Sequence, residues 1–394
     1  MKRSARAMVQ TGPRMLELQE FPIPHVNGDD AIIRVEACGI CGTDLETFRG
    51  DIPLRYPVIP GHEAVGIIEE IGETASKAWG VIPGDRVIVP AELSCGQCRA
   101  CTDGLTCLSS PGTHGFLPTT VEPALWGGYS EYLYLSPQSR PMKMDATVDV
   151  SIAALFNPLG AGFAWAVNAP DLQPEQSIAI LGPGQRGLAG VVAAKHRGAS
   201  QIFVTGFGDR DHQKLELARR FGADLALNAQ STDIVAELLD ATDGRGVDVV
   251  VDTTPHSTQS IHDALRIVRA GGTVVLAGLK GQTIDGFSTD EIAMRRLTLK
   301  GVRAVDRESF QQAIDLIENN PQGLSEMQTH RFPLEQADTA LATLAEGTGI
   351  AISLDPSARI PCTTPKAIQM PTNGKGRPPD SATAPLRSYQ FCSG

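Results

Sequence analysis

The sequence predicts an α/β protein in which a β-rich segment precedes a parallel sheet flanked by helices. Residues 1–158 are rich in Gly and Pro and contain short runs of alternating apolar and polar residues. Residues 159–301 repeat a strand, a turn and a helix, and a glycine-rich turn follows the first of these strands. Strands that alternate with helices form a parallel sheet with helices on its faces.

The first segment is predicted to consist of strands and turns. Apolar and polar residues alternate in AIIRVEA (31–37) and DRVIVPA (85–91), which is typical of half-buried strands. The repeat in 159–301 predicts strands at SIAILG, IFVTG, VDVVVDT and TVVLAG, and helices at LAGVVAAKHRG, KLELARRFGAD and IHDALRIVRAGG. We expect this segment to form a domain of its own.

The end of the chain divides into two parts. Residues 302–356 predict a helix (SFQQAIDLIENN), a short FPL segment, a second helix (LEQADTALATLAEG) and a strand (IAISLDP), and we expect them to return to the first domain. Residues 357–394 are dense in Pro, Ser, Thr and Gly without apolar periodicity, which predicts a disordered tail. A docking segment ending in Phe391 and Cys392 is the alternative.

Composition argues for an enzyme that acts on small molecules. The 394 residues carry 34 Lys and Arg against 45 Asp and Glu, a net charge of -11, which argues against nucleic acid or an anionic membrane as partner. No run approaches a membrane span, and the basic first residues lack the apolar core of a signal peptide. We expect a cytoplasmic protein; organelle targeting is the weaker alternative.

Four cysteines in 13 residues form a C-x2-C-x2-C-x5-C cluster: Cys95, Cys98, Cys101 and Cys107. Short spacers allow four thiolates to converge on one zinc ion, and four thiolates leave no open coordination position. The cluster therefore predicts a structural zinc site. Two disulfides or four unrelated buried thiols are the alternatives, and the absence of a signal peptide disfavours disulfides.

The turn GPGQRG predicts a dinucleotide site. Gly182, Gly184 and Gly187 follow an apolar strand and precede a helix in the order G-x-G-x-x-G. The first glycine allows a tight turn, the second lets the backbone approach a pyrophosphate and the third lets helix pack on strand. The strand-turn-helix context makes this motif more specific than the bare pattern.

The choice between NAD and NADP stays open in the sequence. The second strand normally ends in an acid that binds the ribose, and here it ends in Thr205 and Gly206, which tilts the balance slightly towards NADP. The following loop offers three cations to a 2′-phosphate and two acids to a free ribose: Arg210, His212, Lys214, Asp209 and Asp211.

Cys41, in ACGICGTD, and His62, in PGHE, are candidate ligands of a catalytic zinc with an open position for substrate. Each is weak evidence alone, because an isolated Cys is more often a buried apolar residue and a His near a turn is often a surface residue. Cys38 also makes a C-x-x-C with Cys41, so a redox pair is conceivable.

The ordered motifs of residues 5–356 resemble the zinc-containing medium-chain dehydrogenase/reductase family, with the alcohol, polyol and threonine dehydrogenases closest in character. The resemblance rests on ACGICGTD, PGHEAVG, GDRV, the four-cysteine lobe, GGYSEY, GPGQRG and THRFPLEQA. It implies a GroES-like catalytic domain at 1–158, completed by 302–356, and a Rossmann domain with a doubly wound parallel sheet at 159–301. It also implies a homodimer or homotetramer, and the TVVLAG region is a candidate for the pairing edge.

The resemblance assigns roles to residues of the first domain. Cys41 and His62 match the first two catalytic zinc ligands, and Glu63 matches an acid beside the metal. Asp44 matches a carboxylate that orients His62. Thr43 matches the hydroxyl that binds the substrate oxygen and starts a proton relay. Glu46 stands where many relatives have a histidine that passes the proton on.

Two departures from the family pattern affect the metal sites. The third catalytic ligand is usually Cys or Glu, and Asn157 stands there; an amide oxygen is a poor zinc ligand beside an anion. Three outcomes are open: Glu63 moves in as ligand, Asn157 and water complete a weaker site, or the catalytic metal is absent. The loop before Cys107 is two residues shorter than usual, and we expect the tetrahedron to survive.

The predicted activity is hydride transfer between a small alcohol or polyol, or its ketone or aldehyde, and NAD(P), with zinc acting as a Lewis acid on the substrate oxygen and Thr43 taking the proton. A zinc-independent reductase of quinones or activated double bonds is one alternative, although such proteins lack the four-cysteine lobe. A catalytically silent nucleotide-binding redox sensor is the other.

Overall fold

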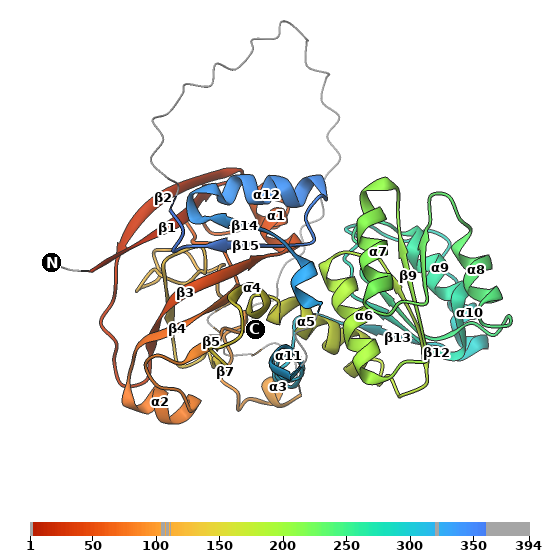
Figure 1. The fold of residues 1–394 in the computed structure, drawn as a ribbon, viewed down its shortest axis with the longest axis horizontal. Helices are drawn as coiled ribbons and strands as arrows, with labels where there is room; N and C mark the ends of the chain where they lie inside the picture. Colours follow the sequence, from red (N-terminus) through yellow and green to blue (C-terminus); the bar gives the residue numbers. More distant parts are fainter. Residues whose placement is uncertain (1–2, 104–106, 108–109, 111, 320–322, 360–394) are drawn as a thin grey trace, which may run out of the picture. The chain divides into compact units, whose positions relative to one another are not determined.

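The computed structural model describes residues 3–103, 107, 110, 112–319 and 323–359. They belong to one compact unit, Met1–Ile360. Two large sheets organise this unit, one of seven strands and one of six (Figure 1). A separate antiparallel pair is formed by β1 (Ser4–Gly12) and β2 (Met15–Pro22). The α/β fold class is therefore confirmed, whereas the predicted tail lies outside the described residues from 360 onwards.

The seven-stranded sheet contains strands from both ends of the unit. Its order is β14-β15-β3-β4-β5-β7, and β6 also pairs with β3. The strands are β3 (Ala31–Ile40), β4 (Glu63–Ile71), β5 (Arg86–Ile88), β6 (Tyr132–Leu135), β7 (Met142–Met144), β14 (Gln328–Pro333) and β15 (Ala351–Asp355). Because β15 pairs antiparallel with β3, the last described strand completes a sheet that the first segment begins.

The six-stranded sheet is parallel throughout, in the order β10-β9-β8-β11-β12-β13. Its strands are β8 (Ser177–Leu181), β9 (Gln201–Gly206), β10 (Leu225–Asn228), β11 (Val247–Asp252), β12 (Val268–Leu276) and β13 (Thr298–Gly301). From β8 the chain adds β9 and then β10 on one side of β8. It then returns to the other side of β8, where it adds β11, β12 and β13. This reversal is the doubly wound topology, and it places ligands at the carboxyl ends of the central strands.

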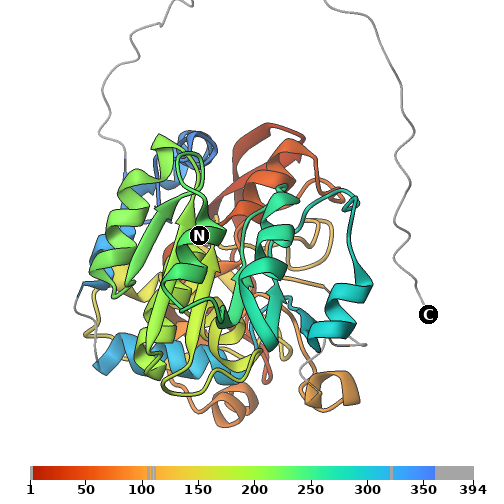
Figure 2. The ribbon, with the colours of Figure 1, turned by 90° about the vertical axis from the view of Figure 1, so that its right-hand side faces the viewer.

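Both faces of the six-stranded sheet are covered by helices (Figure 2). Alternate residues of β8 point to opposite faces. Ile178 and Ile180 pack in one apolar cluster with residues of α6 and α7, whereas Ala179 and Leu181 pack in another with residues of α8 and α9. Continuous apolar strands such as SIAIL are thus explained by burial on two sides.

The helices have the following bounds: α1 (Gly42–Arg49), α2 (Glu73–Trp79), α3 (Arg99–Thr102), α4 (Val150–Ala153), α5 (Phe156–Gly162), α6 (Gln185–Arg197), α7 (His212–Arg220), α8 (Ile234–Asp240), α9 (Gln259–Ile267), α10 (Thr289–Arg295), α11 (Arg307–Asn319) and α12 (Ala337–Glu346). The remaining helical elements are the π-helix η1 (Phe163–Asn168) and the 3-10 helices η2 (Asp209–Asp211), η3 (Leu324–Met327) and η4 (Leu334–Gln336). Among the described residues, no helix combines the length and apolar character needed to cross a membrane.

Two details differ from the sequence prediction. The helix predicted at IHDALRIVRAGG ends at Ile267, and Val268 already pairs with Val247 in the sheet. Gly271, with φ of 72°, adopts a left-handed conformation that a continuing helix would not allow. The TVVLAG strand is also not an edge: β12 pairs with β11 and with β13, so β13 is the outer strand on that side.

His114 gives the first segment a pH-dependent stability. Its ring is 1% exposed and lies within hydrogen-bond distance of the Trp126 carbonyl and the Ser139 hydroxyl. Burial lowers the pKa of His114 from 6.5 to about 4. The unfolded chain therefore binds more protons than the folded chain between these values, and the stability present above pH 6.5 is lost as the pH falls towards 4.

We expect the free energy of unfolding of the wild type to fall by about 3 kcal/mol more than that of His114→Asn between pH 7 and pH 4. Denaturant unfolding at several pH values measures this difference. Parallel pH profiles of the two proteins would contradict a buried, neutral His114.

Candidate metal centres and nucleotide site

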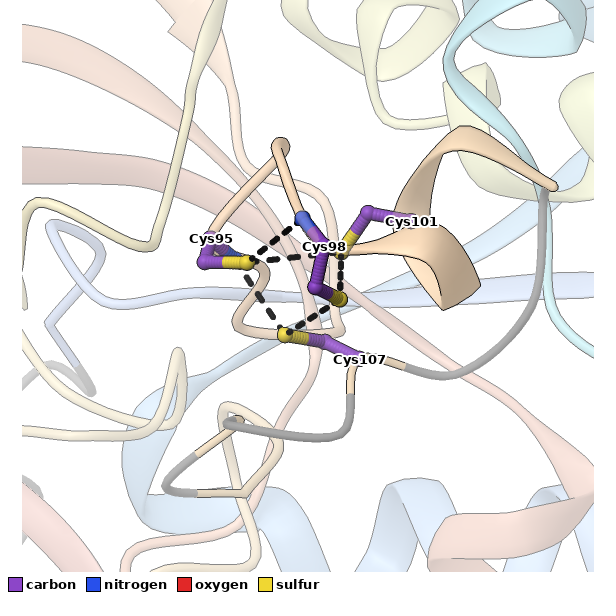
Figure 3. Close-up of side chains that lie close together, drawn as sticks. All are labelled: Cys95, Cys98, Cys101 and Cys107. Atoms are coloured by element: carbon purple, nitrogen blue, oxygen red, sulfur yellow. Dashed lines mark hydrogen bonds between the residues drawn. The ribbon is translucent and has the colours of Figure 1, made fainter.

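The four cysteines predicted to bind zinc converge in the structure (Figure 3). Cys95 and Cys98 lie on a turn, Cys101 lies on α3, and Cys107 follows on the chain. Their sulfur atoms all lie within 4.8 Å of one another. The Cys98–Cys101 sulfur distance is 3.5 Å, and the Cys95–Cys101 and Cys98–Cys107 distances are both 3.9 Å.

These distances fit a zinc tetrahedron. With Zn–S bonds of about 2.3 Å, its sulfur–sulfur edges are about 3.8 Å long. A disulfide would bring two sulfurs to about 2.05 Å, which none of these three pairs approaches. The amide of Cys98 donates to the Cys95 sulfur at 3.3 Å and the amide of Cys95 to the Cys107 sulfur at 3.4 Å. Such donors stabilise thiolates, so the donor set suits a closed structural zinc site.

A second cluster forms where β3 and β4 meet. In the antiparallel register Gly39 lies opposite Glu63, so residues just after β3 lie beside those just before β4. This pairing brings Cys41 next to His62 although they lie 21 positions apart in the chain. The Cys41 sulfur lies 3.1 Å from His62 Nε2, and the ligand atoms of Cys41, His62 and Glu63 lie within 4.8 Å of one another.

Asp44 connects the two candidate ligands. Cys41 is the N-cap of α1, and Asp44 in its first turn accepts the Cys41 backbone N–H at 2.9 Å. The other carboxylate oxygen of Asp44 faces His62 Nδ1 at 3.4 Å. His62 Nε2 thereby points towards the Cys41 sulfur, which lies at the N-terminus of α1. Burial by itself lowers the pKa of His62. The neighbouring Cys41 and Asp44 raise this pKa by a larger amount, so the pKa of His62 lies well above the usual range.

Glu63 is a buried carboxylate with an incomplete set of partners. It is 1% exposed, and its Oε1 lies 3.6 Å from Arg186 Nη2. Burial raises the pKa of Glu63, against the lowering effect of nearby His62 and Arg186. The side chains of Cys41, Asp44 and Glu63 can together carry three negative charges, opposed by the Arg186 guanidinium and by a protonated His62. A divalent cation would neutralise the cluster, so these residues fit a zinc ion.

Asn157 lies on a separate element, α5, and is 4% exposed. Its Oδ1 has no hydrogen-bond partner among the described residues. The same is true of Glu63 Oε1. Buried polar atoms without partners are rare, which indicates that both side chains serve a ligand or water. Of the two, Glu63 is the one that can offer an anionic ligand, and its ligand atom lies within 4.8 Å of those of Cys41 and His62.

Thr43 and Glu46 lie one turn apart on α1, so their side chains project from the same side of the helix. Both residues are partly exposed. Burial raises the pKa of Glu46, whereas the charges of His256 and Arg186 lower it. A raised carboxyl pKa suits a group that takes up and releases a proton.

The glycine-rich turn joins β8 to α6 as predicted. Gly182 has φ of 101°, and a Cβ on Gly187 would lie 1.9 Å from the Gly182 carbonyl oxygen, so neither position accepts a side chain. Gly184, the N-cap of α6, is exposed, and a Cβ there would meet no atom within 4 Å. The turn thus leaves open space directly at the helix N-terminus, which fits the pyrophosphate of a dinucleotide.

The other two predicted cofactor residues lie near the end of β9. Gly206 is the last residue of that strand and is buried. Arg210 is exposed and lines a pocket of about 400 Å³ together with His212, Gly347 and Thr348. Arg210 therefore faces the segment between α12 and β15.

Cys38 offers little to redox chemistry. It is fully buried, and burial raises the pKa of its thiol well above the usual range. A reactive cysteine needs an accessible thiolate, which this environment disfavours. The cluster with His62 and Glu63 instead gives Cys41 a metal-binding role that Cys38 does not share.

Sequence reasoning missed two contributors. Arg186 is a charged residue inside the glycine-rich turn, and its guanidinium lies 4.9 Å from the Trp165 ring centre as well as near Glu63. A cation between two glycines of such a turn was the available signal. Lys280 lies 2.7 Å from Asp252 at the carboxyl end of β11, where Asp252 is buried and Lys280 is partly buried. Only the fold brings this second pair together.

Comparisons with known proteins agree with this geometry. The family model for the alcohol dehydrogenase GroES-like domain matches residues 27–145, and the model for zinc-binding dehydrogenases matches residues 187–319. "Probable alcohol dehydrogenase adh" of Mycobacterium tuberculosis is 41% identical over 346 residues, covering 86% of this chain and 94% of that protein. Sorbitol dehydrogenase of Bacillus subtilis is 31% identical over 340 residues, covering 85% of this chain and 92% of that protein.

Solved structures with the same fold include alcohol dehydrogenase of Thermotoga maritima, with a TM-score of 0.81 and 27% identity over 90% of this chain and all of that chain. A zinc-binding dehydrogenase of Sinorhizobium meliloti 1021, solved with NADP bound, has a TM-score of 0.79 and 26% identity over 90% of this chain and all of that chain. The two sheets and the metal clusters thus occur in a chain that matches these dehydrogenases over nearly its whole described length.

Proposed function

Because this chain belongs to the zinc-containing medium-chain dehydrogenase/reductase family, we infer that it is a zinc-containing, NAD(P)-dependent oxidoreductase of the alcohol dehydrogenase type. Its substrates are small alcohols or polyols and the corresponding ketones or aldehydes. The comparisons lend no support to a zinc-independent quinone reductase or to a silent redox sensor.

The observation that carries the proposal is the buried cluster of Cys41, His62 and Glu63, in which Asp44 accepts the Cys41 backbone N–H and lies 3.4 Å from His62 Nδ1. Zinc held there supplies a Lewis acid for the substrate oxygen. Asp44 keeps the His62 ring in one orientation, and Arg186 offsets part of the charge of Glu63. Gly184 leaves room for the cofactor at the start of α6.

We propose that two side chains of α1 remove the hydroxyl proton of the alcohol substrate. With a nicotinamide bound to take up hydride, the Thr43 hydroxyl would accept this proton and release its own proton towards Glu46, one turn further along the helix. Glu46 is partly exposed and can pass the proton to water. In this chain a carboxylate thus does the work that a histidine does in many relatives.

Glu63 is proposed as the third ligand, in place of Asn157. A carboxylate is a stronger zinc ligand than a neutral amide, and Glu63 already lies in the cluster. We expect Glu63→Gln to lower the zinc affinity of this site about 100-fold or more, whereas Asn157→Ala lowers it about 10-fold or less. Competition of each variant with a calibrated chelator measures these affinities.

Asn157→Glu provides the reverse test, because it restores an acid at the position where relatives have one. As a single substitution it should strengthen zinc binding relative to the wild type. Combined with Glu63→Gln, it should restore part of the zinc affinity that Glu63→Gln loses. Loss of zinc from Asn157→Ala with full retention in Glu63→Gln would show that the amide, and not the carboxylate, is the ligand.

A homodimer or homotetramer is proposed, with β13 as the pairing strand. β13 pairs only with β12 among the described strands, so its other edge is free. Leu279, three residues after β12, and Met294, near the end of α10, are 75% and 84% exposed. A free sheet edge and large exposed apolar side chains both favour contact with a second copy.

The division into a GroES-like catalytic domain (1–158 with 302–356) and a Rossmann domain (159–301) is kept as a proposal, as is a cytoplasmic location. A screen of alcohols, polyols and their carbonyl products tests the function, with the appearance or loss of reduced cofactor as the readout. A zinc-loaded protein that binds cofactor but turns over no member of the panel would overturn it.

A further inference from the structure

Asp211 occupies the place of the acid that the sequence lacks at the end of β9. A Cβ on Gly206 would lie 3.0 Å from Asp211 Cβ and 3.3 Å from Asp211 Oδ2. The same Cβ would lie 2.9 Å from Pro183 of the glycine-rich turn. The carboxylate of Asp211 thus fills the space that a side chain at position 206 would take, beside the turn that receives the cofactor.

We infer that Asp211 is the ribose-binding carboxylate and that it makes this chain select NAD over NADP. This inference rests on the proposed nucleotide site. The carboxylate is fixed from two sides: Oδ2 accepts the Phe207 backbone N–H at 2.9 Å, and Oδ1 lies 3.0 Å from Lys214 Nζ. Two carboxylate oxygens offer about four acceptor positions, so capacity for ribose hydroxyls is left over.

The same loop disfavours the binding of a 2′-phosphate. It would bring a charge of about -1.5 to -2 next to a carboxylate that is itself mostly buried. The backbone donors after β9 are already engaged, Phe207 N–H by Asp211 and Gly208 N–H by Asn228 Oδ1 at 2.9 Å. Lys214 is paired with Asp211 and is 9% exposed.

The other two cations of the loop, Arg210 and His212, lie beside the segment between α12 and β15. Arg210, His212 and Lys214 line the pocket of about 400 Å³ together with Asp209, Gly347 and Thr348, and Asp211 is not among the residues that line it. A Cβ on Gly347 would lie 3.8 Å from Arg210 Cδ. Arg210 is thus directed to the α12–β15 segment, whereas the Asp211 carboxylate lies at the end of β9 and is connected to this pocket through its ion pair with Lys214.

Equilibrium titration of the full-length protein with NADH and with NADPH, followed by cofactor fluorescence, tests this inference without turnover. The wild type should bind NADH at least about 10-fold more tightly than NADPH. Asp211→Asn keeps an oxygen for the Phe207 amide but loses the charge, and it should lower that ratio about 10-fold. Asp209→Asn makes the same charge change two residues earlier, on an exposed side chain, and should leave the ratio within about 2-fold.

The ratio separates recognition from a structural role, because a distorted loop would weaken both cofactors alike. Tighter binding of NADPH by the wild type, lost in Arg210→Ala, would overturn the inference and assign the 2′-phosphate to the Arg210 pocket. Equal ratios in wild type and Asp211→Asn would also overturn it. Failure to bind either cofactor would instead contradict the nucleotide site itself, and with it the proposed function.

Discussion

Cys41→Ser is expected to remove one of about two zinc ions per chain and to lower kcat/KM for the best alcohol about 1000-fold or more. The reason lies in the charge of the cluster. Serine replaces a thiolate by a neutral hydroxyl, which leaves one anionic ligand, Glu63, beside His62. A Lewis acid contributes several kcal/mol to the stabilisation of charge on the substrate oxygen, and each 1.36 kcal/mol corresponds to a factor of ten in rate.

Cys38→Ser is the matched control, since it makes the same atomic change three residues earlier in the same C-x-x-C. Cys38 is fully buried and is not part of the metal cluster, so this variant should keep both zinc ions and most of the activity, with at most a lower melting temperature. Elemental analysis of zinc, steady-state kinetics and cofactor titration are measured on both variants. Equal loss of activity in the two would point to a redox pair and away from a zinc ligand.

The parts of this molecule that could be predicted from sequence are those whose partners lie close together along the chain. The spacers within Cys95–Cys101 hold three ligands near one another in almost any fold, and the glycine-rich turn is a continuous strand-turn-helix unit. Cys41 and His62 are different, because only the register of β3 and β4 brings them together. The resemblance to a known family was needed to pair them in advance.

Interactions that depend on tertiary packing could not be predicted from the sequence. The position at the end of β9 was correctly recognised as lacking an acid, but the carboxylate of Asp211 returns to that point through the short turn η2. The same limit applies to the link between Arg186 and Glu63, which joins the nucleotide turn to the metal cluster. The choice of β13 over TVVLAG as outer strand also depends on strand order, which local patterns do not encode.

Cys98→Ser is expected to abolish zinc binding at the four-cysteine cluster and to lower the melting temperature by about 10 °C or more. Cys98 contributes a sulfur at 3.5 Å from Cys101 and 3.9 Å from Cys107, so its loss opens the tetrahedron. The remaining three thiolates would repel one another without a fully coordinated cation. Differential scanning calorimetry and zinc analysis measure the two effects.

Ser94→Ala is a suitable control, because the Ser94 hydroxyl lies 3.3 Å from the Cys101 sulfur but is not a ligand. It should keep the zinc ion and change the melting temperature by no more than about 3 °C. Turnover at low temperature, expressed per folded chain, then distinguishes the two metal sites. We expect Cys98→Ser to retain the kcat of the wild type within about 3-fold, because the Cys41, His62 and Glu63 cluster is built on other elements. Loss of turnover in a folded Cys98→Ser protein would show that the four-cysteine cluster takes part in the reaction, whereas an unchanged melting temperature would contradict a structural zinc.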